Sequence, residues 1–180
     1  MKRIIVGVTG ASGMLYAKQF LDALKGKAEV YVVLSDAGKK IAKLENVDLE
    51  KYPFTYKSNA KLEAEIASGS FLYDAMVVVP CSMKTLSAIA HGYADTLIVR
   101  AAEVTLKERR KLILVPRETP LSRVHLENML KANDAGAVIM PASPPFYSKP
   151  QTISELVDMI TARILDHCGI EHDIGKRWHP

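Results

Sequence analysis

A glycine-rich segment near the N-terminus has the residue types of a phosphate or cofactor loop. Gly7–Gly13 lies between a β-branched run and an apolar pattern of helical spacing. Glycines let the backbone approach a ligand closely, and the start of the following helix presents free N–H groups to an anion. The spacing matches neither the G-x-G-x-x-G dinucleotide fingerprint nor a P-loop with Gly-Lys-Ser/Thr. An ordinary turn between a strand and a helix explains the segment equally well.

A second candidate is Cys81-Ser82-Met83-Lys84-Thr85, which follows another apolar run. Ser82 and Thr85 offer hydroxyls, and the helix start offers amides to a ligand. A plain helix cap by Ser82 with Cys81 as a small core residue is the simpler explanation of these two residues. Cys81 is a weak candidate for a nucleophile, because no histidine lies close to it in the sequence.

The segment Arg100–Pro120 carries the most informative charges. Lys107 falls two helical turns after Arg100, on nearly the same face, and Arg117-Glu118 follows a buried strand. Three cations near a strand end suit a phosphate-bearing substrate, and a single Glu among them suits proton transfer. A solvated charged helix explains residues 108–110 but explains Arg117 and Glu118 less well, since these follow a fully apolar strand.

Two further residues could contact a phosphate. Tyr147 follows Pro144-Pro145-Phe146 on a stiff loop, and Arg163 lies in the middle of an apolar helix. An Arg in such a helix needs a partner or an exposed face. Without other evidence, an Arg that extends from the flank of the helix into solvent is the simpler explanation.

Alternating strand and helix patterns must position these residues. The patterns predict strands at Arg3–Thr9, Glu29–Leu34, Ala75–Val79, Lys111–Val115 and Ala137–Met140. They predict helices at Met14–Leu24, Asp36–Leu44, Ser82–Ala90, Leu121–Asn133 and Thr152–His167. The irregular pattern of residues 45–69 predicts a loop with room for one short helix. This order predicts an α/β fold in which helices cover both faces of a parallel sheet, in one domain spanning residues 1–180.

Each predicted strand ends in a polar or turn-forming cluster. These clusters are Thr9–Ser12, Ser35-Asp36, Cys81-Ser82, Arg117–Thr119 and Ser143–Tyr147. In open α/β sheets, ligands bind along the carboxyl edge of the strands. We therefore expect the five loops to converge on one site.

Composition excludes several classes of protein. The net charge of +4 on 180 residues is too small and too dispersed to indicate nucleic-acid binding. Two cysteines without metal-type spacing, and no Asp-rich motif that would hold magnesium diphosphate, predict neither a disulfide framework nor a metal site. The apolar N-terminus breaks at Gly7 and indicates a first strand rather than a signal peptide. No apolar stretch is long enough to span a bilayer, so we expect a soluble, cytoplasmic protein.

Several motifs together resemble those of the UbiX-type flavin prenyltransferases. They are Thr9–Gly13, Pro80–Ser87, Arg100–Arg110, Leu114–Pro120 and Phe146-Tyr147, in this order. The resemblance extends from Lys2 to about Trp178, and its Leu-Lys-Glu-Arg-Arg and Val-Pro-Arg-Glu-Thr-Pro blocks are highly specific. It implies a flavodoxin-like or Rossmann-like fold in a dodecamer whose active sites are shared between subunits. The implied reaction joins a dimethylallyl group from dimethylallyl phosphate or diphosphate to reduced FMN. The product, prenylated FMN, serves UbiD-type decarboxylases, in ubiquinone biosynthesis or other UbiD-linked decarboxylation.

Matched position by position, the resemblance also implies roles for individual residues. The implied FMN contacts are Gly10, Ala11, Ser12, Ser35, Ser82, Met83, Lys84, Thr85 and Arg117. The implied prenyl-phosphate contacts are Tyr147 and Arg163, with Lys107 and Arg100 adding positive charge. Glu118 resembles the acid/base at the reacting flavin, and Ser12 and Glu45 resemble helpers that position or relay protons. Lys107 would also stabilise the phosphate as charge develops on it.

Two alternative functions are compatible with a fold of this class. FMN-dependent decarboxylases that oxidise a peptidyl cysteine would be expected to carry a catalytic His in the N-terminal third, and this chain has no His before His91. A non-catalytic flavin carrier of the flavodoxin type explains the glycine loop but not the block of Arg, Lys and Glu residues. Flavin turnover without a prenyl donor would support the first alternative, and tight FMN binding without reaction would support the second.

Overall fold

A computed structural model describes residues 1–175 of the chain, so the end of the family resemblance at Trp178 lies outside the described residues. Strands and helices alternate along most of the chain. The strands are β1 (Lys2–Val8), β2 (Ala28–Leu34), β3 (Thr55–Ser58), β4 (Ala75–Cys81), β5 (Lys111–Pro116) and β6 (Val138–Ile139). The helices are α1 (Met14–Leu24), α2 (Asp36–Leu44), the 3₁₀ turn η1 (Glu65–Ala67), α3 (Met83–His91), α4 (Leu97–Lys107), α5 (Arg123–Asp134) and α6 (Ile153–Cys168).

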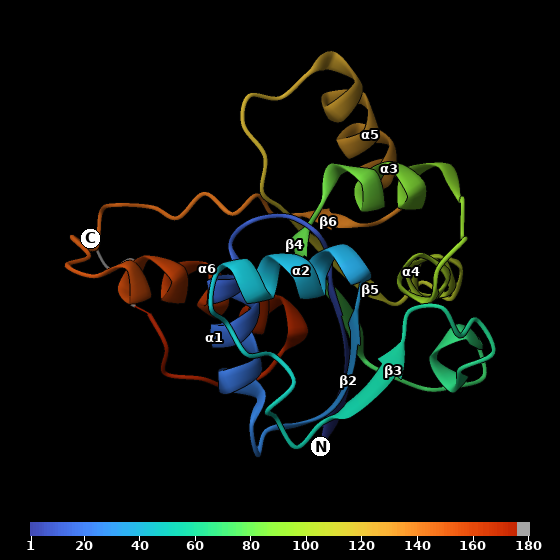
Figure 1. Cartoon of the computed structure of the whole chain (residues 1–180), viewed down its shortest axis with the longest axis horizontal. Helices are drawn as coiled ribbons and strands as arrows, with labels where there is room; N and C mark the ends of the chain where they lie inside the picture. The colour runs from blue at the N-terminus through green and yellow to red at the C-terminus, as the bar shows by residue number, and fades with distance from the viewer. Residues whose placement is uncertain (176–180) are drawn as a thin grey trace.

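The six strands form one parallel sheet in the order β3-β2-β1-β4-β5-β6. The predicted α/β class and parallel sheet are thus confirmed. The chain leaves β1 in one direction to build β2 and β3, and later returns to the other side of β1 to build β4, β5 and β6 (Figure 1). The switch in direction therefore lies between β1 and β4, where open sheets of this type bind their ligands.

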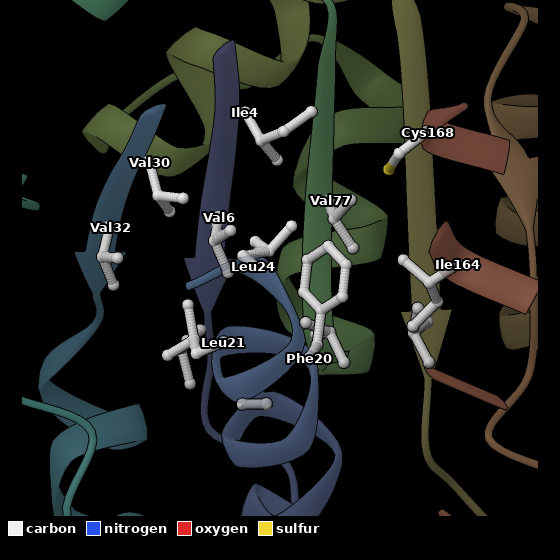
Figure 2. Close-up of a cluster of buried hydrophobic side chains, with 14 of the residues drawn as sticks. Ile4, Val6, Phe20, Leu21, Leu24, Val30, Val32, Val77, Ile164 and Cys168 are labelled. Carbon is white, nitrogen blue, oxygen red and sulfur yellow. The ribbon is translucent and has the colours of Figure 1, made fainter. Parts of the chain in front are cut away.

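Helices cover both faces of the sheet, as the sequence predicts. Side chains of α1 and α6 contribute to the core on one face, and side chains of α3 and α4 contribute to the core on the other. The central strand β4 is buried along its whole length, which explains its continuous apolar run. Figure 2 shows the first core, in which Phe20, Leu21 and Leu24 of α1 face the strands and Ile164 of α6 joins them. Burying each such side chain stabilises the fold by about 1.5–3 kcal/mol.

Strand β3 was not predicted, and the helix α4 was not among the predicted helices, although the spacing of Arg100 and Lys107 indicates a helix. Residues 45–69 form β3 and the short helix η1 rather than a loop with one short helix alone. The strand has only four residues, Thr-Tyr-Lys-Ser, and it lies at the edge of the sheet, where it pairs with β2 alone. An edge strand needs no apolar run because solvent reaches it, so its pattern resembles that of a polar loop.

The two cysteines, Cys81 and Cys168, are buried and form no disulfide. Burial raises the pKa of each thiol to about 12, so both stay protonated near neutral pH. Cys81 is therefore a core residue rather than a nucleophile. Among residues 1–175, His, Cys, Asp and Glu side chains form no group of three that could hold a metal ion. Over the same residues, every helix is too short or too polar to cross a membrane.

Candidate functional site

Thr9 connects the glycine loop to the end of β4. Its buried hydroxyl donates to the carbonyl of Pro80 at 2.9 Å and accepts from the backbone N–H of Ser82 at 2.7 Å. The Thr9 amide also donates to the Pro80 carbonyl, at 3.2 Å. These bonds join the ends of β1 and β4 across the switch point, so the two following loops are held in one arrangement.

Helices α2 and α3 begin beside this junction, and a serine caps the N-terminus of each. The Ser35 hydroxyl accepts from Gly38 N at 3.0 Å at the start of α2. The Ser82 hydroxyl accepts from Thr85 N at 3.3 Å at the start of α3 and donates to the Thr85 hydroxyl at 3.1 Å. Free backbone N–H groups and the helix dipoles make such a pair of N-termini suited to an anion, above all a phosphate.

A cavity of about 330 Å³ lies between these helix starts. Its polar lining includes Ser35, Asp36, Asn59, Ser82, Lys84, Thr85, Asp95 and Thr96. Its apolar lining includes Gly10, Ala37, Ala88, Ile98 and Val99. Gly10 must be glycine, because a Cβ at this position would lie only 2.5 Å from the Cβ of Ala37. A polar end and an apolar wall in one cavity suit a ligand with a phosphate and a carbon-rich body.

Five of the residues predicted to contact a cofactor line this cavity: Gly10, Ser35, Ser82, Lys84 and Thr85. Ala11 and Met83 are neighbours of lining residues but do not line the cavity themselves. The expected convergence of the loops after β1, β2 and β4 is therefore observed. The loops after β5 and β6 contribute no side chain to this cavity.

A second group of predicted residues lies at the other end of the glycine loop. Gly13 adopts a left-handed conformation with φ of 102° and caps α1 without a side chain. The Glu45 carboxylate replaces that missing cap, because it accepts from Gly13 N at 2.9 Å and from Met14 N at 2.7 Å. Arg117, which follows β5, donates from Nε to the carbonyl of Ser12 at 3.1 Å. Glu45, Ser12 and Arg117 are thus brought together, as residues far apart in the sequence.

The pKa of Glu45 is lower than its ordinary value of 4.5. Burial alone would raise this pKa, but hydrogen bonds from the Ser12 hydroxyl and from the amides of Gly13 and Met14 outweigh it, and the charge of Arg117 adds to them. Glu45 is therefore an ionised hydrogen-bond acceptor at neutral pH. In this state it can hold the Ser12 hydroxyl in a fixed orientation.

We expect Glu45→Ala to lower the free energy of unfolding by about 1 kcal/mol at pH 7, the usual effect of losing a helix cap. Since the pKa of Glu45 is lower in the folded than in the unfolded chain, its contribution is present above about pH 4.5 and is lost as the pH falls through the folded pKa. Urea unfolding at pH 7 and pH 3 should thus show the difference between parent and variant shrinking in acid. Glu127→Ala, at an exposed ion pair on α5, is the control. A difference that is the same at both pH values would contradict this account.

The expected cluster of three cations and one carboxylate is not formed within a single chain. The first turn of α4 lines the cavity, but Lys107 is the last residue of α4, about 14 Å from Ile98 along the helix axis. Lys107 precedes the start of β5, whereas Arg117 and Glu118 follow the end of that strand. The prediction that they share one strand end was wrong because β5 runs between them.

The remaining charged candidates have local partners in the chain. Arg100 pairs with Glu103 at 2.7 Å, and Lys107 pairs with Glu108. Glu118 is exposed at the carboxyl edge of the sheet, where its Oε1 accepts from Thr119 N at 3.0 Å.

Tyr147 and Arg163 lie on the side of the molecule that carries α6. Ser148, beside Tyr147, contacts Met159, which is one helical turn before Arg163. The side chain of Arg163 is 65% exposed and faces Asp166 at 4.0 Å, and Tyr147 is 49% exposed. Neither residue lines the cavity between α2 and α3. The structure thus places both residues outside that cavity, and the loop that carries Tyr147 contacts α6 through Ser148.

Sequence reasoning missed several residues of the cavity wall, among them Asn59, Thr96, Ile98 and Val99. Asn59 follows β3, which was not predicted. Thr96 is the N-cap residue of α4, and Ile98 and Val99 lie in its first turn. The helical spacing between Arg100 and Lys107 indicated α4 but not where it begins. The apolar run before Arg100 could have shown that its first turn is buried.

A larger cavity, of about 640 Å³, lies at the opposite edge of the sheet and is lined by Lys2, Lys27 and residues 169–173. Its two lysines already have backbone partners, since Lys2 Nζ donates to the carbonyl of Cys168 and Lys27 Nζ donates to that of Glu171. None of its lining residues within the described part of the chain begins a helix, and it lies at the edge where the strands begin. The smaller cavity at the switch point is therefore the better candidate site.

Comparison with known proteins shows which proteins this chain resembles. A family model described as Flavoprotein matches residues 1–165. The chain is 49% identical over 180 residues to the flavin prenyltransferase UbiX of Methanocaldococcus jannaschii, with 98% of each chain covered. The crystal structure of AnUbiX in complex with FMN and dimethylallyl pyrophosphate superposes with a TM-score of 0.95 at 42% identity, covering 99% of this chain and 98% of that one. A dodecameric FMN-dependent UbiX-like decarboxylase from Escherichia coli O157:H7 gives 0.90 at 42% identity, covering 99% and 100%.

Proposed function

Because this chain belongs to the UbiX-type flavin prenyltransferases of the flavoprotein family, we propose that it joins a dimethylallyl group to N5 and C6 of reduced FMN. The enzyme is a transferase. The observation that carries the proposal is the cavity at the switch point, where two serine-capped helix N-termini meet an apolar wall. The donor is dimethylallyl phosphate or diphosphate, and the product is prenylated FMN.

The cavity suits FMN, because its polar end can hold the phosphate and its apolar wall can hold the flavin ring. The amides at the starts of α2 and α3, the hydroxyls of Ser82 and Thr85, and the ammonium of Lys84 would hold the phosphate. Because Gly10 has no side chain, the glycine loop can lie directly against Ala37 at the start of α2. Arg117 and Glu45 hold the far end of that loop through Ser12, Gly13 and Met14, next to the start of α1. We assign to Ser12 and Glu45 the role of positioning or relaying protons at the edge of the flavin, and to Arg117 a contact with FMN.

The reaction breaks an allylic C–O bond, leaves an allyl cation and a phosphate anion, and forms bonds from the prenyl group to N5 and then C6 of the flavin. Cations are needed where the phosphate leaves, and we assign this role to Arg163 and Lys107. Tyr147 would add a neutral hydrogen-bond donor, and Arg100 would add further positive charge. The first bond releases the N5 proton and leaves the prenyl C=C bond. Adding a proton to that double bond makes its far carbon an electrophile, which C6 attacks, and the ring closure then releases the aromatic proton of C6. Glu118, exposed at the carboxyl edge of the sheet next to Arg117, is the base that we assign to that proton. With a monophosphate as the leaving group, no step of this scheme requires a metal ion.

The prenyl-phosphate residues require more than one subunit. Lys107, Tyr147 and Arg163 do not line the flavin cavity of their own chain, and the last two are exposed. We therefore propose a homo-oligomer, a dodecamer, in which neighbouring subunits complete each active site. Large apolar side chains that are exposed in the single chain support such an assembly: Leu121, Val124, Leu126 and Leu130 around α5, and Phe146 and Tyr147.

The biological setting that we propose follows from the family. The whole chain acts as one flavin-binding prenyltransferase domain, and prenylated FMN passes to a UbiD-type decarboxylase. We place the protein in the cytoplasm, which agrees with two buried, unpaired thiols. Neither nucleic acid nor a membrane is a proposed partner.

The function is tested with FMN reduced under anaerobic conditions and incubated with enzyme and dimethylallyl phosphate. We expect mass spectrometry to show FMN enlarged by one isoprene unit, and titration to show binding of FMN but not of NAD(P). Parallel reactions with the diphosphate distinguish the two donors. Unchanged FMN that binds tightly would support a flavin carrier instead, and turnover of FMN with no donor would support the peptidyl-cysteine decarboxylase.

A further inference from the structure

The first turn of α4 has no cap of its own. Thr96 is its N-cap residue but makes no side-chain cap hydrogen bond, and the turn contains no acidic residue. Leu97, Ile98 and Val99 are buried, with exposed fractions of 0%, 1% and 3%. The first amides of a helix have no partner within the helix, and buried amides without a partner destabilise the fold. This turn therefore depends on a partner from elsewhere in the chain.

Asn59 is that partner. Its backbone carbonyl accepts from Leu97 N at 2.9 Å, and its side-chain Oδ1 accepts from Ile98 N at 3.0 Å. Asn59 directly follows β3 and is 39 residues from Ile98 in the sequence. One residue thus caps the two leading amides of a distant helix and joins the edge of the sheet to α4.

The capped turn forms part of the flavin cavity. Asn59, Thr96, Ile98 and Val99 all line it, together with Gly10. Ile98 also packs against β1, because a Cβ placed on Gly7 would lie 3.1 Å from its Cγ2. A shift of Ile98 would therefore change both the cavity wall and the contact with the strand that leads into the glycine loop.

We propose that Asn59 is a positioning residue for FMN binding, which acts through the first turn of α4. The inference rests on the proposed function, since it takes FMN as the occupant of the cavity. When the turn frays, Ile98 and Val99 leave the wall against which the flavin is held. The apparent affinity is the intrinsic affinity multiplied by the fraction of molecules in which the turn is formed. Loss of the side-chain cap lowers that fraction and therefore weakens FMN binding.

The test compares Asn59→Ala, Asn59→Asp and Thr152→Ala with the parent. Asn59→Asp keeps an acceptor at the helix start. Thr152→Ala is the matched control, because Thr152 Oγ1 caps α6 by accepting from Glu155 N at 3.1 Å and that helix does not line the cavity. FMN titration measures affinity, thermal unfolding measures stability, and hydrogen–deuterium exchange follows residues 97–99 without ligand.

We expect Asn59→Ala to raise the Kd for FMN about two- to fivefold and to speed exchange at residues 97–99. Thr152→Ala should lower the melting temperature by about as much as Asn59→Ala does, but it should leave the Kd for FMN unchanged. Asn59→Asp should match the parent in melting temperature and in Kd. The inference is overturned if Asn59→Ala binds FMN as tightly as the parent does, or if Thr152→Ala weakens FMN binding as much as Asn59→Ala does. It is also overturned if Asn59→Asp binds FMN as weakly as Asn59→Ala. A parent that binds no FMN would instead overturn the proposed function, while exchange at residues 97–99 would still report the cap.

Discussion

Glu118→Gln is expected to bind FMN as tightly as the parent and to form prenylated flavin about 10²–10⁴-fold more slowly. The substitution removes the carboxylate that would accept the proton from C6 but keeps the size of the side chain. It also keeps the Oε1 acceptor that the structure uses to bind Thr119 N, so the loop after β5 should retain its shape. The measurement is the rate of product formation at saturating donor, followed by mass spectrometry, alongside FMN titration.

Glu127→Gln is the matched control for Glu118→Gln. Glu127 is an exposed carboxylate on α5 that pairs with Arg123, and it does not line the flavin cavity. Its variant should turn over at the parental rate. If Glu118→Gln also reacts at the parental rate, the proton goes elsewhere, and the phosphate released from the donor is the acceptor to examine next. A variant that loses FMN would show instead that Glu118 acts in binding.

Arg163→Ala and Tyr147→Phe are expected to impair use of the prenyl donor while leaving FMN affinity nearly intact. Both residues lie on the α6 side of the molecule, and neither lines the cavity that we assign to FMN. A guanidinium and a phenol can both donate to a phosphate. Losing a hydrogen bond to a charged group costs about 1.5–3 kcal/mol, which raises the donor concentration for half-maximal rate roughly 10- to 150-fold. Arg163→Ala should have the larger effect, because it also removes a charge.

The control for Arg163→Ala is Arg123→Ala. Arg123 is an exposed helical Arg with a carboxylate partner one turn away, as Arg163 is with Asp166. Steady-state rates at varied donor and fixed FMN separate a donor effect from a flavin effect. Loss of FMN with normal donor dependence in both variants would contradict the assignment. Arg163 would then be a structural residue whose role is the ion pair with Asp166.

The fold class followed from the sequence because buried parallel strands require apolar runs. β1, β2, β4 and β5 each appear as such a run, and the polar clusters that follow them indicated the carboxyl edge as the site. The edge strand β3 was missed, because a strand of four residues exposed to solvent has no distinctive pattern. Because β3 was missed, Asn59 and its contact with α4 were missed as well.

The candidate site was predictable where residues follow a strand directly. Gly10, Ser35 and Ser82 each lie within two residues of a strand end, so the parallel sheet alone brings them together at one edge. Lys107 was misplaced because helical spacing gives the face of a helix but not the edge of the sheet at which the helix ends. The helix carries Lys107 toward the edge where the strands begin.

The sequence by itself determined the α/β class, the cap by Ser82 and the family motifs, because these depend on periodicity and on residues adjacent in the chain. Only the tertiary structure decided that Glu45 caps α1, that Arg117 holds Ser12, and that Asn59 caps α4. Each of these contacts joins residues separated by more than thirty positions. No local pattern specifies such a contact, because it forms only when the sheet order brings the loops of different strands to one edge.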